Sequence, residues 1–323
     1  MTPPKTSLGL AIFTFTHRLR QNPAIADPLK LLELARELGA GGIQTSLAGL
    51  DEARGAELRR KAENDGMWIE GSESLPKRKE DVDRFDAALR GVKAAGATTF
   101  RTVLLGGRRY EAFDGEAAWE RFQADARRWL ELAEPSLARH GLTAAFENHK
   151  DFRVSELLPF LQRLGSERVA VCVDFANNFT LMEDNAEVVE ALAPVSAGGH
   201  VKDMALGAYA DGFLAADVPL GQGVHDLPRM IGALRKARPG ARLCLEMSTR
   251  DPLKVPVFTE KYWATLKGVS GADFARALKL VRERGVAREK LPAVDALPLD
   301  ERVKLEEEAV RVSLAYAADV LKC

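Results

Sequence analysis

The sequence has no excess of charge of either sign. Its 46 Lys and Arg residues are matched by 47 Asp and Glu residues, which leaves a formal net charge of −1 at pH 7. Nucleic acids and acidic membrane surfaces select proteins with basic patches, and acids and bases are interspersed along this chain. The composition therefore argues against nucleic acid and membrane as partners and favours a small molecule.

Long apolar runs are also missing. The N-terminal stretch Leu8–Phe15 is too short to span a bilayer, and no small-residue cleavage site follows an apolar region of sufficient length. We interpret it as a first β-strand and expect neither a signal peptide nor a transmembrane segment.

Cysteine is scarce, with three residues and no CxxC pair. An odd number at wide spacing argues against a disulfide framework. Cys172 and Cys244 lie inside apolar runs, where a reduced, buried thiol is the ordinary state, and Cys323 ends the chain and is expected to be exposed. This pattern favours a reducing, cytoplasmic location.

What the chain does contain is one repeated unit: an apolar strand, a short polar loop and an amphipathic helix. Eight strands are predicted, at Leu8–Phe15, Gly42–Thr45, Met67–Glu70, Thr99–Leu105, Leu142–Glu147, Val169–Asp174, Gly198–Val201 and Arg242–Glu246. The predicted helices that follow them include Pro28–Leu38, Asp51–Asn64, Glu80–Ala95, Gly115–His140, Val154–Leu164, Asn185–Ala193 and Leu227–Ala237.

This alternation is typical of the α/β class and gives the strand count of a (β/α)8 TIM barrel. A doubly wound open sheet is the competing architecture. It usually has fewer strands and often a Gly-rich phosphate loop after the first one, whereas here the first strand runs into Thr16-His17-Arg18. The barrel is favoured.

The chain continues beyond the eighth strand. Helices are predicted at Phe258–Leu266, at Ala272–Arg284 and, after a proline-containing connector, at Leu297–Leu321. The last helix carries an apolar stripe, formed by Val303, Val310, Leu314 and Leu321. We expect a barrel over residues 1–266 and a helical extension over 267–323. The stripe could pack on the barrel or on a second subunit of a homo-oligomer.

Four consecutive predicted strands end on residues that bind metals: Glu147, Asp174, His200 and Glu246. In a barrel, the carboxyl ends of neighbouring strands converge on one face, so these side chains could surround one ion. Three carboxylates and an imidazole suit a divalent ion such as Mn²⁺, Mg²⁺, Co²⁺ or Zn²⁺, with Mn²⁺ our first expectation. Solvated acids and helix caps are the ordinary alternative for any one of them. Four in succession make a metal site the better interpretation.

The chain resembles the sugar phosphate isomerase/epimerase superfamily, the xylose isomerase-like barrels. The resemblance spans about Leu8–Trp263 and rests on several short elements: Phe146-Glu147-Asn148, Val173-Asp174-Phe175-Ala176-Asn177, His200-Val201-Lys202-Asp203, the Leu220–Pro228 turn and Leu245-Glu246. It implies one divalent metal ion held by Glu147, Asp174, His200 and Glu246. It also implies that Glu147 and Glu246 move protons.

The sequence departs from that resemblance at two points. Ketose 3-epimerases carry a histidine where this chain has Asn177, and their signature after the first glutamate differs from Asn148–Asp151. Both departures argue against 3-epimerisation of a free ketose. With five histidines and no basic face, the chain also lacks what the related DNA-repair endonucleases need.

The leading hypothesis is a metal-dependent isomerase or epimerase that moves a proton on a sugar or sugar-like ketone through a metal-stabilised enediolate. A lyase or dehydratase acting on a keto-sugar or inosose could use the same groups. A non-catalytic sugar-binding barrel is the third alternative.

Five further residues are predicted to contact substrate: Lys202, Arg250, Asn177, Lys150 and His17. For each, an ordinary role as a surface or salt-bridged side chain is the alternative, and Asp203 is the expected partner of Lys202 in that case.

Two more residues are noted from their positions in the strands. Glu70 could face the pocket. Arg101 lies within a strand and, if buried, needs an acidic partner.

Overall fold

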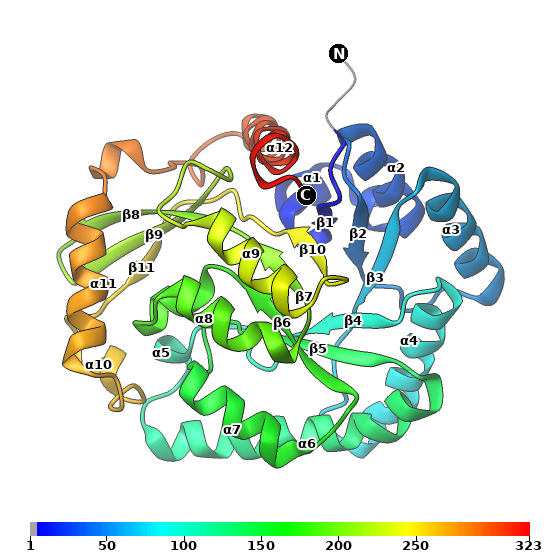
Figure 1. The fold of residues 1–323 in the computed structure, drawn as a ribbon, viewed down its shortest axis with the longest axis horizontal. Helices are drawn as coiled ribbons and strands as arrows, with labels where there is room; N and C mark the ends of the chain where they lie inside the picture. Colours follow the sequence, from blue (N-terminus) through cyan, green and yellow to red (C-terminus); the bar gives the residue numbers. More distant parts are fainter. Residues whose placement is uncertain (1–4) are drawn as a thin grey trace.

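Apolar segments of three to six residues form eight parallel strands that close into a barrel in the computed structural model, which describes residues 5–323. The order around the ring is β1-β10-β7-β6-β5-β4-β3-β2 (Figure 1). The strands are β1 (Gly9–Ala11), β2 (Gly42–Thr45), β3 (Trp68–Ser72), β4 (Thr99–Thr102), β5 (Thr143–Glu147), β6 (Val169–Asp174), β7 (Ser196–Val201) and β10 (Arg242–Leu245). This closed ring confirms the (β/α)8 barrel and excludes an open sheet.

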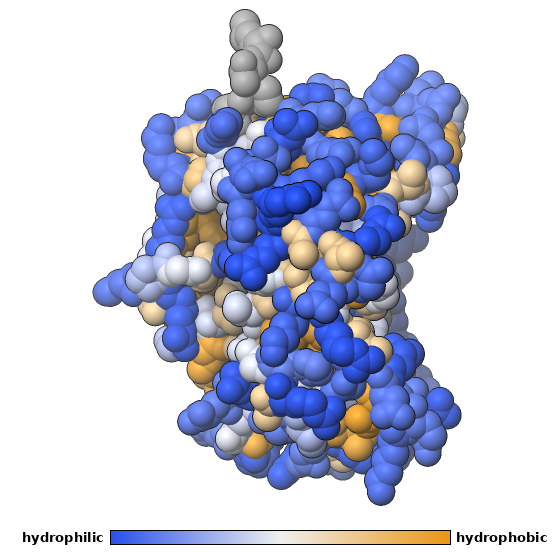
Figure 2. Space-filling model, turned by 90° about the vertical axis from the view of Figure 1, so that its right-hand side faces the viewer, coloured by the Kyte–Doolittle hydropathy of each residue, from blue (hydrophilic) through white to orange (hydrophobic). Residues whose placement is uncertain are grey.

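Amphipathic helices surround the strands and bury their apolar faces against them. They are α2 (Pro28–Leu38), α3 (Glu52–Asp65), α4 (Val82–Ala94), α6 (Glu116–His140), α7 (Val154–Leu164), α8 (Asn185–Leu192) and α9 (Leu227–Ala237). Aspartates cap several of them, and Asp226 accepts from the backbone N–H of Arg229 at the start of α9. The outer faces meet solvent: the side over α2, α3 and α4 is mainly hydrophilic, with small separate apolar patches (Figure 2).

The first strand is shorter than predicted. Only Gly9–Ala11 pairs in the barrel, while Ile12–Phe15 forms a 3₁₀ turn (η1) that runs into the short helix α1 (Thr16–Gln21). Threonine alternates with large apolar residues in this segment, a pattern that is also typical of a strand. Thr14 instead donates to the carbonyl of Leu245 at 3.0 Å, and Phe13 turns outward with 44% of its surface exposed. The turn brings Phe13 to the mouth of the barrel.

A second, smaller sheet lies beside the barrel, on the left of Figure 1. The hairpin of β8 (Asp203–Tyr209) and β9 (Gly212–Val218) pairs with β11 (Leu253–Val255). Helices α5 (Arg109–Ala112), α10 (Glu260–Trp263) and α11 (Gly271–Arg284) accompany it, and a separate apolar cluster forms there around Phe179, Phe213 and Tyr262. The sequence predicted no strands in this excursion, and a longer helix at 258–266 than α10.

The last helix, α12 (Leu299–Tyr316), packs on the barrel of its own chain. It lies against α1, and the turn of π-helix that continues it, Ala317–Leu321, lies against α9. Figure 1 shows α12 beside α1, where the eighth helix of a barrel is expected. All four residues of the predicted stripe are buried, and Val310 and Leu314 belong to the main core. The stripe therefore gives no reason to expect a second subunit.

In the described part of the chain, no helix is long and apolar enough to cross a membrane. The three cysteines are free thiols. Cys172 and Cys244 are buried, as expected, but Cys323 is half-buried and not exposed, because Thr6 donates to its carbonyl and holds the end of the chain against the barrel.

Candidate metal centre

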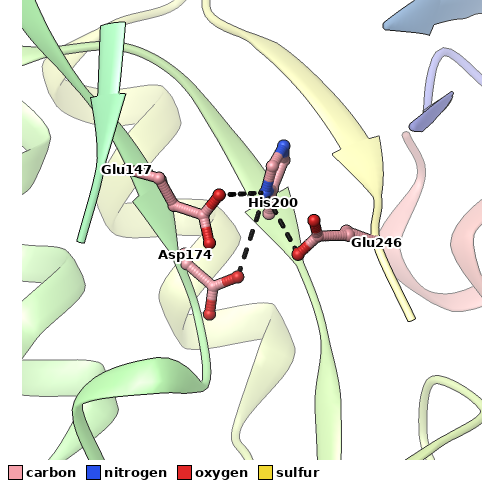
Figure 3. Close-up of side chains that lie close together, drawn as sticks. All are labelled: Glu147, Asp174, His200 and Glu246. Atoms are coloured by element: carbon pink, nitrogen blue, oxygen red, sulfur yellow. Dashed lines mark ion pairs between the residues drawn. The ribbon is translucent and has the colours of Figure 1, made fainter. Parts of the chain in front are cut away.

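The four strand-end residues form one buried cluster. Glu147 ends β5, Asp174 ends β6, His200 lies one residue before the end of β7, and Glu246 directly follows β10. One potential ligand atom from each lies within 4.8 Å of the others. His200 Nδ1 is 3.4 Å from Glu147 Oε2, 3.4 Å from Glu246 Oε2 and 3.9 Å from Asp174 Oδ2 (Figure 3). The side chains of Glu147, Asp174 and His200 are fully buried.

The barrel order explains this convergence. β5, β6, β7 and β10 are consecutive in the ring, and Asp174 pairs directly with His200 in the register of β6 and β7. Neighbouring strands lie about 4.8 Å apart, so residues at adjacent carboxyl ends come within reach of one ion. Local strand pairing, and not a special loop, assembles the cluster.

The orientation of His200 leaves the correct nitrogen free for a metal. Its Nε2 lies 2.8 Å from Gln44 Oε1, and the Gln44 amide nitrogen donates to Glu70 Oε2 at 2.7 Å. Because the Gln44 oxygen accepts, Nε2 carries the hydrogen and Nδ1 faces the carboxylates. Such a hydrogen bond behind a ligating histidine is typical of metal sites.

Two buried atoms of the cluster have no hydrogen-bond partner among the described residues: His200 Nδ1 and Asp174 Oδ2. Lys202 Nζ lies 3.0 Å from Asp174 Oδ2 as an ion pair, but outside hydrogen-bond geometry. Buried polar atoms are rarely left unpaired. A divalent ion bound by both atoms and by the two glutamates would satisfy them, and a set of three carboxylates and one imidazole suits such an ion. The residues fit a metal.

Comparison with known proteins identifies the family of the chain. The model of the xylose isomerase-like TIM barrel family matches residues 29–268. The chain belongs to this family. No curated protein matches its sequence.

Solved structures show the same fold at low sequence identity. D-psicose 3-epimerase from Clostridium cellulolyticum, solved with D-tagatose, has a TM-score of 0.61 at 13% identity, covering 98% of this chain and 100% of its own. A probable 3-DHS dehydratase from Bacillus anthracis has a TM-score of 0.56 at 16% identity, with 86% and 100% covered. A xylose isomerase-like barrel from Mycobacterium smegmatis, solved with magnesium, has a TM-score of 0.53 at 19% identity, with 86% and 98% covered.

In this member of the family, two cations compensate the charge of the cluster. Arg101, from β4, donates through Nε to Glu147 Oε2 at 2.8 Å and through a second nitrogen to the same oxygen. Lys202 lies 2.5 Å from Glu246 Oε2 as well as 3.0 Å from Asp174. Arg101 thus has the acidic partner that its position in a strand demands. Lys202 pairs with two of the cluster carboxylates.

These contacts set the charge states of the two glutamates. Burial alone would raise their pKa values, but Arg101 holds the pKa of Glu147, and Lys202 and His200 hold that of Glu246, well below the usual range. Burial raises the pKa of Asp174. Both glutamates are therefore ionised at neutral pH and can act as ligands or bases.

The pKa of His200 is raised, whereas that of an isolated buried imidazole would be lowered. Burial lowers its pKa, but Cys172 and the two glutamates together raise it well above the usual value. Binding of an ion at Nδ1 therefore competes with a proton.

A cavity of about 650 Å³ opens above the cluster. Glu246 and Lys202 form part of its lining, whereas Glu147, Asp174 and His200 lie beneath. Its walls include residues from five loops or strand ends: Phe13, Ser72, Glu73, Arg101, Gly107, Arg108, Lys150 and Arg250. Its lining is mostly polar, as expected for a site that binds a hydroxylated molecule.

The predicted substrate contacts fall into three groups. Lys150, Lys202 and Arg250 line the cavity. Asn177 does not, but its amide donates to Glu147 Oε1 at 2.9 Å and its oxygen accepts from Lys150 Nζ. His17 lies outside the lining: its Nε2 is 2.6 Å from the carbonyl of Thr249, and its backbone N–H donates to Glu306 of α12. His17 thus connects three segments of the fold.

Asp203 does not pair with Lys202. Its carboxylate accepts backbone N–H groups from Met204, Gly221, Gly223 and His225, at 2.9–3.2 Å. A Cβ at Gly223 would lie 2.0 Å from Asp203 Oδ1, so the turn requires glycine there. Asp203 therefore holds the Leu220–Pro228 turn in place.

Sequence reasoning missed three residues of this site. Gln44 was an unremarkable polar residue in the short run Gly42–Thr45. Glu73 lies beyond the predicted end of its strand and accepts from the N–H groups of Leu47 and Ala48. Phe13 was assigned to a strand. For Gln44 a signal existed, since a polar side chain inside a buried strand needs a partner.

Proposed function

We propose that this protein is a divalent-metal-dependent isomerase or epimerase that moves a proton on a sugar or sugar-like ketone. The observation that carries the proposal is the cluster itself: two ionised glutamates, an aspartate and a correctly oriented histidine, with two unpartnered atoms, below a polar cavity. A divalent ion held there, with Mn²⁺ our first choice, would polarise a substrate carbonyl and stabilise negative charge that develops on oxygen.

The two glutamates would have different parts in this chemistry. Glu246 lines the cavity and can reach a substrate carbon as general base. Glu147 is fully buried, and its two oxygens are already bonded to Arg101 and Asn177. We therefore assign Glu246 as the first base. Glu147 would hold the ion, and Glu246, which carries the proton after the first step, would return it to carbon in an isomerisation. For epimerisation, Glu147 would first have to take up a proton from solvent and shift its side chain, and would then deliver that proton to the opposite face.

A lyase is the second candidate, because one structure of the same fold is described as a probable 3-DHS dehydratase. The same base would remove the proton, and a hydroxyl or other group on the neighbouring carbon would leave. A non-catalytic barrel that binds sugar is the third alternative.

Solvent deuterium exchange tests the proposal. Metal-loaded protein would be incubated in D₂O with a panel of keto-sugars and inososes, and C–H exchange followed by NMR. We expect exchange that Glu246→Gln lowers by about 10³-fold or more. Glu111→Gln is the matched control, since Glu111 lines the same cavity but pairs with Arg108. Ligand binding with no exchange for any of these ketones would favour the non-catalytic alternative. Release of water or another group would identify the lyase.

Other properties stay predictions. We propose that the barrel unit and the segment 267–323 fold together, since α12 packs against α1. A cytoplasmic location and a homo-oligomer were expected from the sequence, but the stripe that suggested the oligomer is buried within the chain and no longer supports it. Light scattering that showed a monomer at all protein concentrations would contradict the homo-oligomer.

A further inference from the structure

The cavity above the cluster is lined by more positive than negative side chains. Three of its cations are paired with carboxylates: Arg101, Lys202 and Arg108. Two others, Lys150 and Arg250, have no carboxylate oxygen within 4.0 Å among the described residues. Carboxylates neutralise Arg101, Lys202 and Arg108. Lys150 and Arg250 have no such partner and are therefore available to a ligand.

Lys150 is the more informative of the two because it is buried. Only 6% of its surface is exposed, and one of its three ammonium N–H groups donates to Asn177. A buried ammonium without a counter-ion is unfavourable. Burial, aided by the charge of Lys202, lowers the pKa of Lys150 to about 8, and a bound anion would reverse that effect.

The backbone holds Lys150 in this position against its own preference. Its φ is 55°, one of three positive values at non-glycine residues in the described part of the chain. The carbonyl of Lys150 accepts from Arg109 N at 3.0 Å, and Asp151 accepts from the N–H groups of His149 and Phe152. Unfavourable backbone that neighbouring contacts enforce is typical of functional positions.

Arg250 is half-buried in the loop that follows Glu246. It donates no hydrogen bond to a described residue by the usual geometric criteria, so its planar group is free for a bidentate contact. Carboxylates and phosphates match that geometry. Lys150 follows β5 and Arg250 follows β10, so an anion between them would be held from two sides of the barrel mouth.

We propose that the substrate of this site carries an anionic group, a carboxylate or a phosphate, that Lys150 and Arg250 bind. This inference rests on the proposed function, which supplies the reacting ketone, and adds that the substrate is negatively charged. Asn177 alone separates Lys150 from Glu147. The anionic group therefore lies on the Lys150 side of the cluster, and the substrate is an acidic or phosphorylated sugar.

The test compares three ketose probes that differ in charge: D-fructose, 2-keto-D-gluconate and D-fructose 6-phosphate. Dissociation constants would be measured by calorimetry on Mn²⁺-loaded protein for the unaltered chain and for Lys150→Gln, Lys150→Arg, Arg250→Gln and Arg108→Gln. The unaltered chain is expected to prefer one anionic probe over D-fructose by about tenfold or more. The preferred probe separates carboxylate from phosphate.

Lys150→Gln and Arg250→Gln should each lower that preference by about tenfold, because the anionic probe loses more affinity than D-fructose does. Lys150→Arg should restore part of it. Arg108→Gln is the matched control and should retain the preference, because Arg108 is paired with Glu111. If Lys150→Gln fails to fold, Arg250→Gln carries the test.

Equal affinity for all three probes, or a preference that survives both substitutions, would overturn the inference. Deuterium exchange separates its failure from that of the proposed function. Exchange on D-fructose without a preference for an anionic probe would contradict only the inferred charge of the substrate. A preference for an anionic probe without exchange on any probe would contradict only the proposed isomerase activity.

Discussion

The two halves of the barrel contribute differently to the cluster. Strands β5, β6, β7 and β10, which we call the ligand half, supply Glu147, Asp174, His200 and Glu246 at or next to their carboxyl ends. Strands β1–β4, the support half, supply no member of the cluster among the described residues. They provide the side chains behind it: Gln44, Glu70 and Arg101.

If the cluster binds an ion as proposed, this division separates the residues that would hold the ion from those that orient and compensate them. The ligand half brings three carboxylates and an imidazole into contact, which without compensation is unfavourable. The support half orients the imidazole through Gln44 and compensates Glu147 through Arg101. Substitutions in the support half should therefore alter the stability of the protein and its affinity for the ion without abolishing ion binding.

The largest effect within the support half is expected from Arg101→Met. It leaves Glu147 buried without its cation, so the free energy of unfolding of the metal-free protein should fall by about 3–5 kcal/mol. Mn²⁺ should recover part of the loss, because the ion replaces the missing positive charge. Chemical denaturation with and without Mn²⁺ measures both.

Arg127→Met is the control for Arg101→Met, since Arg127 forms an exposed pair with Glu131 and should contribute about 0.5 kcal/mol or less. A loss for Arg101→Met that resembled the control, or that Mn²⁺ did not reduce, would mean that Arg101 does not compensate the cluster.

Gln44→Leu should have a moderate effect. It removes the acceptor that fixes His200, so Mn²⁺ affinity should fall by about 10–100-fold while binding persists. Competition with a chelating indicator measures this. Glu70→Gln is the companion variant, because an amide at position 70 can still accept from Gln44, and its effect should be clearly smaller. Unchanged affinity in Gln44→Leu would show that the support half does not orient His200.

His17→Gln is expected to have the smallest effect on the site. The ring of His17 bonds to the backbone of Thr249 and does not line the cavity, so the free energy of unfolding should fall by about 1 kcal/mol. The KM of whichever substrate the deuterium screen identifies should change less than twofold. A tenfold rise in KM at unchanged stability would return His17 to the substrate-binding role that the sequence suggested.

The ligand half was more predictable than the support half for a physical reason. Glu147, Asp174, His200 and Glu246 each end an apolar run, and a charged residue after such a run marks a strand end at the barrel mouth. Gln44 and Arg101 lie inside their strands, where the sequence does not show which face is inward. Arg101 was recognised only as a residue that would need an acid.

The fold was predictable to a similar extent. The strand and helix count identified the barrel, because each unit repeats the same pattern. The hairpin of β8 and β9 was missed although Asp211-Gly212 at its turn is a hairpin signal. The repeat of strand, loop and helix was expected to continue there, and the hairpin interrupts it. The place of α12 was left open, since an apolar stripe does not reveal whether the surface that it covers belongs to the same chain.

Metal content decides whether the ligand half binds one divalent ion. Protein prepared without chelator, or reconstituted with Mn²⁺, would be analysed by inductively coupled plasma mass spectrometry beside the double variant Asp174→Asn/Glu246→Gln. We expect about one ion per chain in the unaltered protein and none in the double variant. No bound ion after reconstitution with Mn²⁺, Mg²⁺, Co²⁺ or Zn²⁺, or equal binding by the double variant, would contradict it.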